Sequence, residues 1–192
     1  MDCKELRRKV IKKYFSEMND MQFEAVTAVN GPVLVLAGAG SGKTTVLVNR
    51  IANLVKFGDG YNSDYSRELT EQEVKWGEDY INGAADYVPN GVFSVSPVNP
   101  WNILAITFTN KAAGELKERI SAKITDGGED IWAGTFHSVC GKILRRYADR
   151  LGFTSHFTIY DTDDQRRLMK EIMRAKNIDD KILTHKSVLS CI

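Results

Sequence analysis

The chain has 192 residues, close to the usual size of one domain, and its hydrophobic fraction of 43% and charged fraction of 27% are typical of a soluble globular protein. Residues 1–15 are basic without an apolar core, so we expect no signal peptide, and no apolar run is long enough to span a membrane. The three cysteines lie far apart without zinc-ligand spacing or a disulfide framework, so we expect a reducing, cytoplasmic location.

The net charge of +1 is unevenly distributed. Residues 58–100 hold eight acidic and two basic side chains, a net charge of −6, so the remainder carries +7. An excess of positive charge suits a polyanionic partner but does not identify one.

The amino-terminal part predicts two helices. Residues 4–17 place apolar side chains on one helix face, and Asn19 then has the position of an N-cap for a second helix. Gln22 lies in the first turn of that second helix. Its amide offers a donor and an acceptor, as reading an adenine edge requires, although a glutamine in a first turn is more often only solvated.

The chain is organised around the motif Ala37-Gly38-Ala39-Gly40-Ser41-Gly42-Lys43-Thr44-Thr45. The run Val33–Leu36 before it predicts a buried parallel strand, and a helical pattern begins near Gly42. The glycine-rich turn can point successive N–H groups inward beside the positive end of that helix, so the motif predicts a phosphate-binding loop. Lys43 adds a cation for the outer phosphates of ATP, and the Thr44 hydroxyl is placed to hold Mg²⁺.

The helix after the loop should cover a sheet. Its apolar residues at helical spacing are Val46, Leu47, Ile51, Leu54 and Val55, whereas Arg50 and Lys56 should be solvated. This helix carries the chain away from the phosphate-binding loop, while ligands of such sheets bind at the carboxyl ends of the strands. The segment that follows should therefore lie far from the nucleotide.

Residues 58–100 break the α/β pattern. They are rich in Gly, Asn, Asp, Ser and Tyr and contain three of the four prolines. A short helix is expected near Leu69–Ile81, with Val74, Trp76 and Tyr80 as its apolar residues. The simpler interpretation is a solvated insertion. The alternative is a partner-binding arm, because exposed aromatic residues in an acidic loop can dock on another protein.

A second strand–turn–helix unit follows the insertion. Residues 102–108 predict a buried strand, and a helix after Lys111 should turn Ala113, Leu116, Ile120 and Ile124 inward. The free N–H groups at that helix start, with Thr107, Thr109 and Asn110, can grip a phosphate. Phe108 emerges where the strand ends, so its ring could stack on an unpaired base, although aromatic residues at strand ends are more often core residues.

A third unit repeats this arrangement. Residues 131–135 predict a strand that enters Phe136-His137-Ser138 after Thr135, and a helix follows. The residues expected to face inward on this helix are Phe136, Val139, Cys140, Ile143, Leu144 and Tyr147, and its outer side is basic through Lys142, Arg145, Arg146 and Arg150. His137 has no second ligand at metal-binding spacing, so we expect a phosphate contact or a helix cap rather than a metal ligand.

The last part of the chain predicts helices. Asp161 ends an apolar run but is followed by Thr162 rather than a second acid, so we do not expect it to complete an NTPase site. Thr162 with Gln165 instead fits a capping box that opens a helix through Met173. Residues 183–192 predict a further helix.

With these segments in place, the chain resembles the amino-terminal part of the UvrD/Rep/PcrA group of superfamily 1 DNA helicases, from Met18 onward without the insertion. The stretches that carry the resemblance are Met18-Asn-Asp-Met-Gln22, Ala37 to Thr45, Ile103-Leu-Ala-Ile-Thr-Phe-Thr-Asn-Lys-Ala-Ala113, Gly134-Thr-Phe-His-Ser138 and Phe157-Thr-Ile-Tyr-Asp-Thr-Asp-Asp-Gln165. The resemblance implies an α/β, P-loop NTPase (RecA-like) parallel sheet flanked by helices. Residues 1–152 would be a partial domain 1A with the 58–100 insertion, and residues 153–192 the start of a helical subdomain 1B.

The resemblance also implies roles for individual residues. Gln22 would read adenine, and Gly38, Ala39, Gly40, Ser41, Gly42, Lys43, Thr44 and Thr45 would hold ATP and Mg²⁺. Thr107, Phe108, Thr109, Asn110, Lys111, Thr135, Phe136, His137 and Ser138 would contact single-stranded DNA. The implied protein is a 3′ to 5′ DNA helicase of repair or replication, cytoplasmic and monomeric, that works at a duplex junction without a membrane.

The chain departs from the group's pattern at three points. Thr45 stands where the group often has arginine, the 58–100 insertion is unusually long, and the acidic Asp-Glu strand and second RecA-like domain are not in this sequence. Phosphoryl transfer needs an acid on Mg²⁺ and positive charge on the leaving phosphate. We therefore expect a fragment that binds nucleotide weakly without turning it over.

Three alternatives stay open on the sequence alone. The first is the helicase subunit of a RecB/AddA-type helicase–nuclease, which shares these motifs. The second is a short protein that binds single strands without motor activity. The third is a P-loop kinase or small-molecule NTPase.

Overall fold

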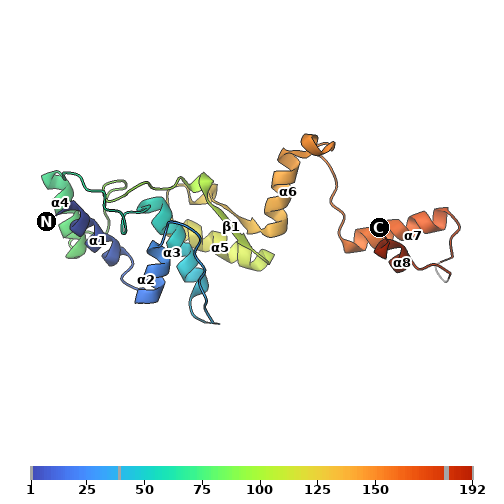
Figure 1. The fold of residues 1–192 in the computed structure, drawn as a ribbon, viewed down its shortest axis with the longest axis horizontal. Helices are drawn as coiled ribbons and strands as arrows, with labels where there is room; N and C mark the ends of the chain where they lie inside the picture. Colours follow the sequence, from blue (N-terminus) through green and yellow to red (C-terminus); the bar gives the residue numbers. More distant parts are fainter. Residues whose placement is uncertain (1, 39, 180–181, 192) are drawn as a thin grey trace. The chain divides into compact units, whose positions relative to one another are not determined.

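The computed structural model describes residues 2–38, 40–179 and 182–191, which divide into two compact units, Met1–Cys140 and Gly141–Ile192 (Figure 1). The first unit contains α1 (Cys3–Tyr14), α2 (Asp20–Thr27), α3 (Lys43–Lys56), α4 (Glu71–Ile81), β1 (Leu104–Thr107), α5 (Asn110–Lys123) and β2 (Trp132–Thr135), with short 3₁₀ turns at Pro100–Asn102 and Gly128–Asp130. Helix α6 (Phe136–Arg146) begins in the first unit and ends in the second. The second unit adds a 3₁₀ turn (Ala148–Leu151), α7 (Thr162–Ala175) and α8 (His185–Ser190).

Strands β1 and β2 form a parallel pair joined by α5. Leu104 is opposite Trp132 and Thr107 is opposite Thr135, so both strands end at the same edge. Helices α3 and α5 cover one face of the pair in a core of Val48, Ile51, Ala52, Ile103, Ala105, Leu116, Ile120, Ile124, Ile131 and Ala133. The side chains of Leu104, Ile106 and Trp132 remain 39–50% exposed. The prediction of a buried strand at 102–108 is therefore correct for one face only.

The prediction of a buried strand at Val33–Leu36 is wrong. These four residues have no strand assignment, and Leu34 and Leu36 are 83% and 87% exposed. A strand forms only where a neighbouring strand accepts its backbone hydrogen bonds, and no described strand pairs with this segment. The structure thus shows a mixed helix–strand fold with a two-stranded parallel sheet.

The insertion is packed rather than merely solvated. Helix α4 lies against α1 (Figure 1), and its Val74, Tyr80 and Ile81 pack on the second hydrophobic core. The buried residues of this core are Leu6, Val10, Ile11, Phe15, Val26, Val46, Phe57, Val88 and Phe93. The buried guanidinium of Arg7 ties α1 to the insertion by donating to the carbonyls of Gly60 (2.6 Å) and Ser63 (3.0 Å). The expected helix is confirmed, but its aromatic residue Trp76 is 36% exposed.

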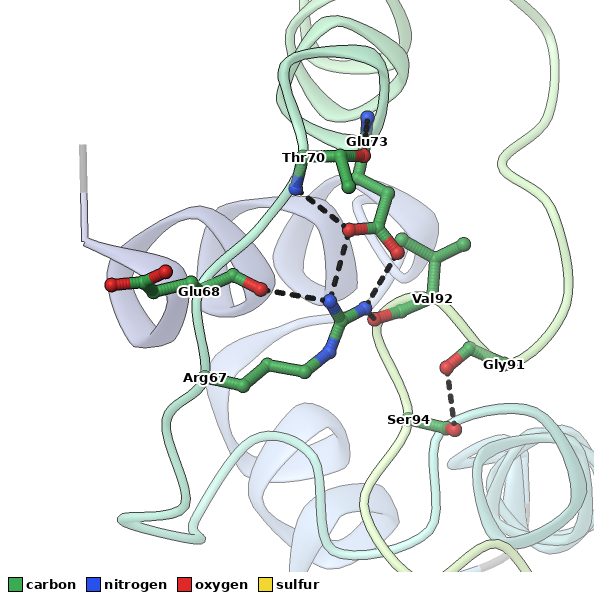
Figure 2. Close-up of polar contacts among 7 residues, drawn as sticks. All are labelled: Arg67, Glu68, Thr70, Glu73, Gly91, Val92 and Ser94. Atoms are coloured by element: carbon green, nitrogen blue, oxygen red, sulfur yellow. Dashed lines mark hydrogen bonds and ion pairs between the residues drawn. The ribbon is translucent and has the colours of Figure 1, made fainter.

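A bidentate ion pair fixes the start of α4 (Figure 2). Arg67 donates to both carboxylate oxygens of Glu73, at 2.9 and 2.7 Å, and to the carbonyls of Glu68 and Val92. Glu73 also closes a capping box, because its carboxylate accepts from the Thr70 N–H at 2.9 Å. The hydrogen bonds from Arg67, followed by the Thr70 N–H, lower the pKa of Glu73 from 4.5 to about 2.

The second unit corrects one prediction, the residue that caps α7. Asp161, not Thr162, caps α7: its carboxylate accepts from the N–H groups of Asp163 and Asp164, each at 2.8 Å. A charged acceptor caps a helix N-terminus better than a hydroxyl because it also interacts with the helix dipole. The last predicted helix is observed as α8, and Ile192 lies outside the described residues.

The expected apolar face of α6 is largely exposed. Val139 is buried and Cys140 half-buried, but Phe136, Ile143, Leu144 and Tyr147 are 40–56% exposed. Helical spacing shows that a face can be buried, not that a partner covers it. In the described residues, no helix is both long and apolar enough to cross a bilayer.

The Arg67–Glu73 pair predicts a pH-dependent contribution to stability. The folded-state pKa of Glu73 is depressed, so its ionised carboxylate stabilises the fold above pH 4.5, and this contribution is lost as the pH falls toward about 2. We expect the melting temperature of Glu73→Gln to lie below that of the wild type at pH 7, with the gap closing between pH 4.5 and about 2. Thermal melts at several pH values measure this.

The matched control is Glu71→Gln, an exposed carboxylate in the same helical turn that forms no ion pair with a described residue. Its melting temperature should track the wild type across this range. A Glu73→Gln gap that stays constant down to pH 2 would show that the ion pair is not formed in solution.

Candidate functional site

The glycine-rich turn leads directly into α3. Gly40 and Gly42 have φ of +76° and +80°, a left-handed conformation that favours glycine. Gly42 is the N-cap of α3, and no side chain caps this helix. By contrast, Asn19, Thr70 and Thr109 use side-chain oxygens to cap α2, α4 and α5. The first amides of α3 therefore have no side-chain acceptor, as an anion-binding helix start requires.

Lys43 folds back over the turn. Its Nζ donates to the carbonyl oxygens of Gly38 at 2.6 Å and Ala37 at 3.3 Å, and the residue is exposed. The Ser41 hydroxyl donates to the same Gly38 carbonyl at 2.8 Å. An ammonium group has three donors, so Lys43 can turn from these carbonyls to an anion without crossing a buried region.

Thr44 and Thr45 are exposed in the first turn of α3. The Thr45 carbonyl accepts from the Asn49 side chain at 2.9 Å, which ties this turn to the next one. The Thr44 hydroxyl is thus available to a ligand at the helix start. Ala39 lies outside the described residues.

Gln22 lies against the turn. Its Nε2 donates to the Ser41 carbonyl at 3.2 Å, and its Oε1 accepts from the Asn19 N–H at 3.3 Å. Asn19 completes a capping box by accepting from the Gln22 N–H at 2.9 Å, which confirms its predicted N-cap position. The alternative of a merely solvated Gln22 is wrong, because both ends of its amide are engaged.

A cavity of about 640 Å³ opens between α2, the turn and the segment before it. Its lining includes Asn19, Gln22, Val33, Gly38, Ser41 and Lys43. This volume lies within the range of small-molecule and cofactor sites. One open cavity therefore joins an amide able to read a base with the glycine-rich turn and its lysine.

Arg50 is a supporting residue that the sequence pattern missed. Its Nη1 donates to the Ala25 carbonyl at 2.6 Å, joining α3 to α2, and burial lowers its pKa. The prediction that Arg50 and Lys56 are solvated is wrong, since both are half-buried. An arginine on the polar side of a helical pattern gives no signal of such a contact.

The two strand ends bring the other predicted segments together. Because Thr107 is opposite Thr135, the helix starts of α5 and α6 lie at the same edge. Thr109 caps α5 by accepting from the Ala112 N–H at 3.2 Å. At α6, the hydroxyl of Thr135 accepts from the Ser138 N–H, also at 3.2 Å.

Exposed side chains surround this edge. Phe108 is 98% exposed, so the alternative that places it in the core is wrong. Phe136 is 56% exposed and makes an edge contact with the ring of His137, and Asn110 and Lys111 are exposed at the start of α5. Among the described residues, no group of three or more His, Cys, Asp or Glu side chains could hold a metal ion.

The chain matches the family model described as the UvrD/REP helicase N-terminal domain over residues 18–64 and 92–192. It is 40% identical over 183 residues to the ATP-dependent DNA helicase PcrA of Bacillus subtilis (strain 168), covering 95% of this chain and 20% of that protein. Against PcrA of Staphylococcus aureus (strain Mu50 / ATCC 700699), identity is 42% over 166 residues, covering 86% and 18%. The chain thus spans about a fifth of the length of these relatives.

The junction of β2 and α6 predicts a steric limit at Gly134. A Cβ there would lie 2.8 Å from the Ser138 Oγ and 3.4 Å from a Val139 methyl carbon. Gly134→Ala should therefore displace Ser138 and lower the free energy of unfolding by roughly 1–3 kcal/mol, as overpacking does. Urea denaturation measures this.

Gly114→Ala is the matched control, because a Cβ at this α5 position meets nothing within 4 Å. It should be neutral or raise stability by about 0.5–1 kcal/mol through helix propensity. Equal stability of the Gly134 and Gly114 variants would contradict the observed junction geometry.

Proposed function

Because this chain belongs to the UvrD/REP helicase N-terminal domain family, we propose that it forms the ATP-binding and single-strand-binding part of an ATP-dependent DNA helicase. The observation that carries this proposal is the single cavity shared by Gln22, the glycine-rich turn and Lys43. The protein would move 3′ to 5′ along DNA as a cytoplasmic monomer acting at a duplex junction, as the family resemblance implies.

The nucleotide lies along the cavity in this proposal. The N–H groups from Gly40 to Thr44 bind phosphate oxygens, and the Lys43 ammonium exchanges the Gly38 carbonyl for the outer phosphates. Gln22 turns its amide from Ser41 to the adenine edge. The Thr44 hydroxyl, exposed at the helix start, would hold Mg²⁺, which neutralises phosphate charge when bound.

The same proposal includes Val33–Leu36 as a strand of the sheet. A strand before the phosphate-binding loop needs neighbouring strands to accept its backbone hydrogen bonds. The exposed apolar side chains of this segment support such pairing with strands from the part of the protein that corresponds to the rest of the relatives' length. We place residues 1–152 in a partial domain 1A and residues 153–192 at the start of subdomain 1B.

A single DNA strand would lie across the edge formed by the starts of α5 and α6. Thr107, Thr109, Asn110 and Lys111 on one side, and His137 and Ser138 on the other, are polar and could contact phosphates. Thr135 is buried, and its hydroxyl holds the start of α6 instead. The rings of Phe108 and Phe136 are exposed, so each could stack on a base. The +7 charge outside the insertion suits a polyanionic partner.

ATP hydrolysis requires chemical groups beyond the residues of this cavity. The carboxylate of Asp161 is engaged as the N-cap of α7. We propose that the acidic magnesium ligand and the arginines that stabilise charge on the leaving phosphate come from the rest of the helicase. The 192-residue chain would then bind ATP but not hydrolyse it.

Lys43→Ala tests the nucleotide site. In the full-length helicase we expect DNA unwinding and DNA-stimulated ATP hydrolysis to fall by at least about 100-fold, because a positioned cation is lost from the reacting phosphates. Lys75→Ala, an exposed lysine of α4, is the matched control and should keep both activities. If Lys43→Ala retained unwinding and its melting temperature were unchanged, the glycine-rich turn would have no role in the mechanism.

Phe108→Ala tests the strand-binding edge. Loss of a stacking ring should weaken single-stranded DNA binding by roughly 1–3 kcal/mol, read by fluorescence anisotropy. The melting temperature should not change, because the side chain is 98% exposed. Tyr87→Ala, a 73% exposed aromatic of the insertion, should leave DNA affinity unaltered. Equal affinities of the Phe108 and Tyr87 variants would contradict base stacking at this position.

A further inference from the structure

A second cavity, of about 260 Å³, lies at the far end of α3 from the phosphate-binding turn. Tyr14 of α1, Lys56 of α3 and Lys123 of α5 line it, with Asn90 and Ser94 from the insertion. We call it the Tyr14 pocket. Since α3 has 14 residues, the pocket is separated from the turn by about 20 Å of helix.

Two ammonium groups meet at one aromatic ring in this pocket. The Nζ atoms of Lys56 and Lys123 lie 5.1 and 5.0 Å from the centroid of the Tyr14 ring. Neither ammonium forms an ion pair or donates a hydrogen bond to a described residue. Their donor groups are therefore directed toward no protein acceptor.

The one acid that lines the pocket does not balance these charges. Asp126 accepts a hydrogen bond from the Asn90 amide at 3.2 Å and lies more than 4 Å from both ammonium groups. Burial lowers the pKa of Lys56; Asp126 opposes this shift, and the neighbouring charge of Lys123 adds to it. The contacts with Tyr14 compensate the two cations in part.

A lysine at the last turn of a helix is favourable in itself, because it complements the helix dipole. That effect accounts for Lys56 and Lys123 each ending a helix, but not for both turning over the same ring. Lys56 is half-buried and Lys123 is exposed, and the two like charges repel, as the effect of Lys123 on the pKa of Lys56 shows. An anion bound near both ammonium groups would offset this repulsion.

We propose that the Tyr14 pocket binds a small phosphate-bearing anion between the ammonium groups of Lys56 and Lys123. An oxyanion with several acceptor oxygens matches two groups that carry three donors each. The volume, below the range of drug-sized ligands, suits inorganic phosphate or a small phosphate monoester rather than a nucleoside triphosphate.

The insertion builds one wall of this pocket. Its loop is closed where the Ser94 hydroxyl donates to the Gly91 carbonyl at 3.0 Å (Figure 2). Tyr14, Asn90 and Gly91 lie outside the residues that match the helicase family model, whereas Lys56 and Lys123 lie inside them. Residues from both inside and outside the family match therefore line the site, and the proposal does not depend on the proposed helicase function.

Titration of the 192-residue chain with inorganic phosphate at constant ionic strength tests this proposal by NMR. The amide signals of Gly91, Ser94 and Thr125 should shift on a single saturable curve. Lys56→Met and Lys123→Met should each raise the apparent Kd at these amides by at least about tenfold, as loss of a charged hydrogen bond does. Lys123→Arg, which keeps the charge, should restore binding in part.

Two controls separate this site from the phosphate-binding turn. Lys75→Met removes an exposed lysine that does not line the pocket and should leave the pocket curve unchanged. The amides of Gly40 to Lys43 report separately on the turn, and their response should persist in Lys56→Met. The proposal would be contradicted if the amide signals of Gly91, Ser94 and Thr125 did not shift, or if they shifted equally in the Lys56 and Lys75 variants. Lys56 and Lys123 would then only complement the dipoles of their helices.

Discussion

The open amino terminus of α3 is the constraint on which the candidate nucleotide site depends. A helix start leaves backbone N–H groups without intrahelical acceptors, and most of the α-helices in the described residues satisfy at least one of them with a side chain. Gly42 cannot do so, and its left-handed backbone turns the preceding loop over the helix axis. Gln22 and Lys43 bridge to that loop through the Ser41 and Gly38 carbonyls, and the Ser41 N–H also donates to the Gly38 carbonyl. The turn is thus held while no side chain caps the start of α3.

The helix starts at the ends of β1 and β2 resemble the start of α3, except that a side chain caps one amide at each of them. Thr109 and Thr135 each accept one amide hydrogen at a helix start, and the parallel register places these starts together. Phosphate contacts from such an edge position a strand without reading its sequence, and exposed rings add sequence-tolerant stacking. Both halves of the proposed mechanism therefore rest on local backbone geometry in the first unit.

Structural features that depend on neighbouring residues in the sequence were predictable, whereas features that depend on contacts with distant segments were not. The Asn19 cap, the start of α3 and the two paired strands follow from turn chemistry and residue period. The run Val33–Leu36 has the composition of a buried strand, but composition cannot supply the neighbouring strands that its backbone needs.

The insertion shows the same limit. Its polar composition indicated solvation, yet Val88 and Phe93 are buried because α1, far away in sequence, covers them. Arg50 contacts α2 and Lys56 contacts α1. Helical periodicity does not include these distant contacts, so it wrongly predicted that both side chains are solvated. The sequence did not decide whether Phe108 is exposed, because an aromatic ring at a strand end can lie either in the core or on the surface.

Hydrogen–deuterium exchange of the 192-residue chain tests the central claim most directly, because it reads the amides at the start of α3 themselves. With Mg²⁺ and ATP, exchange of the amides from Gly40 to Val46 should slow, while adenosine, which lacks phosphates, should leave them unchanged. Equal protection by ATP and adenosine, or none at ATP concentrations that saturate binding, would contradict a phosphate site at this helix start.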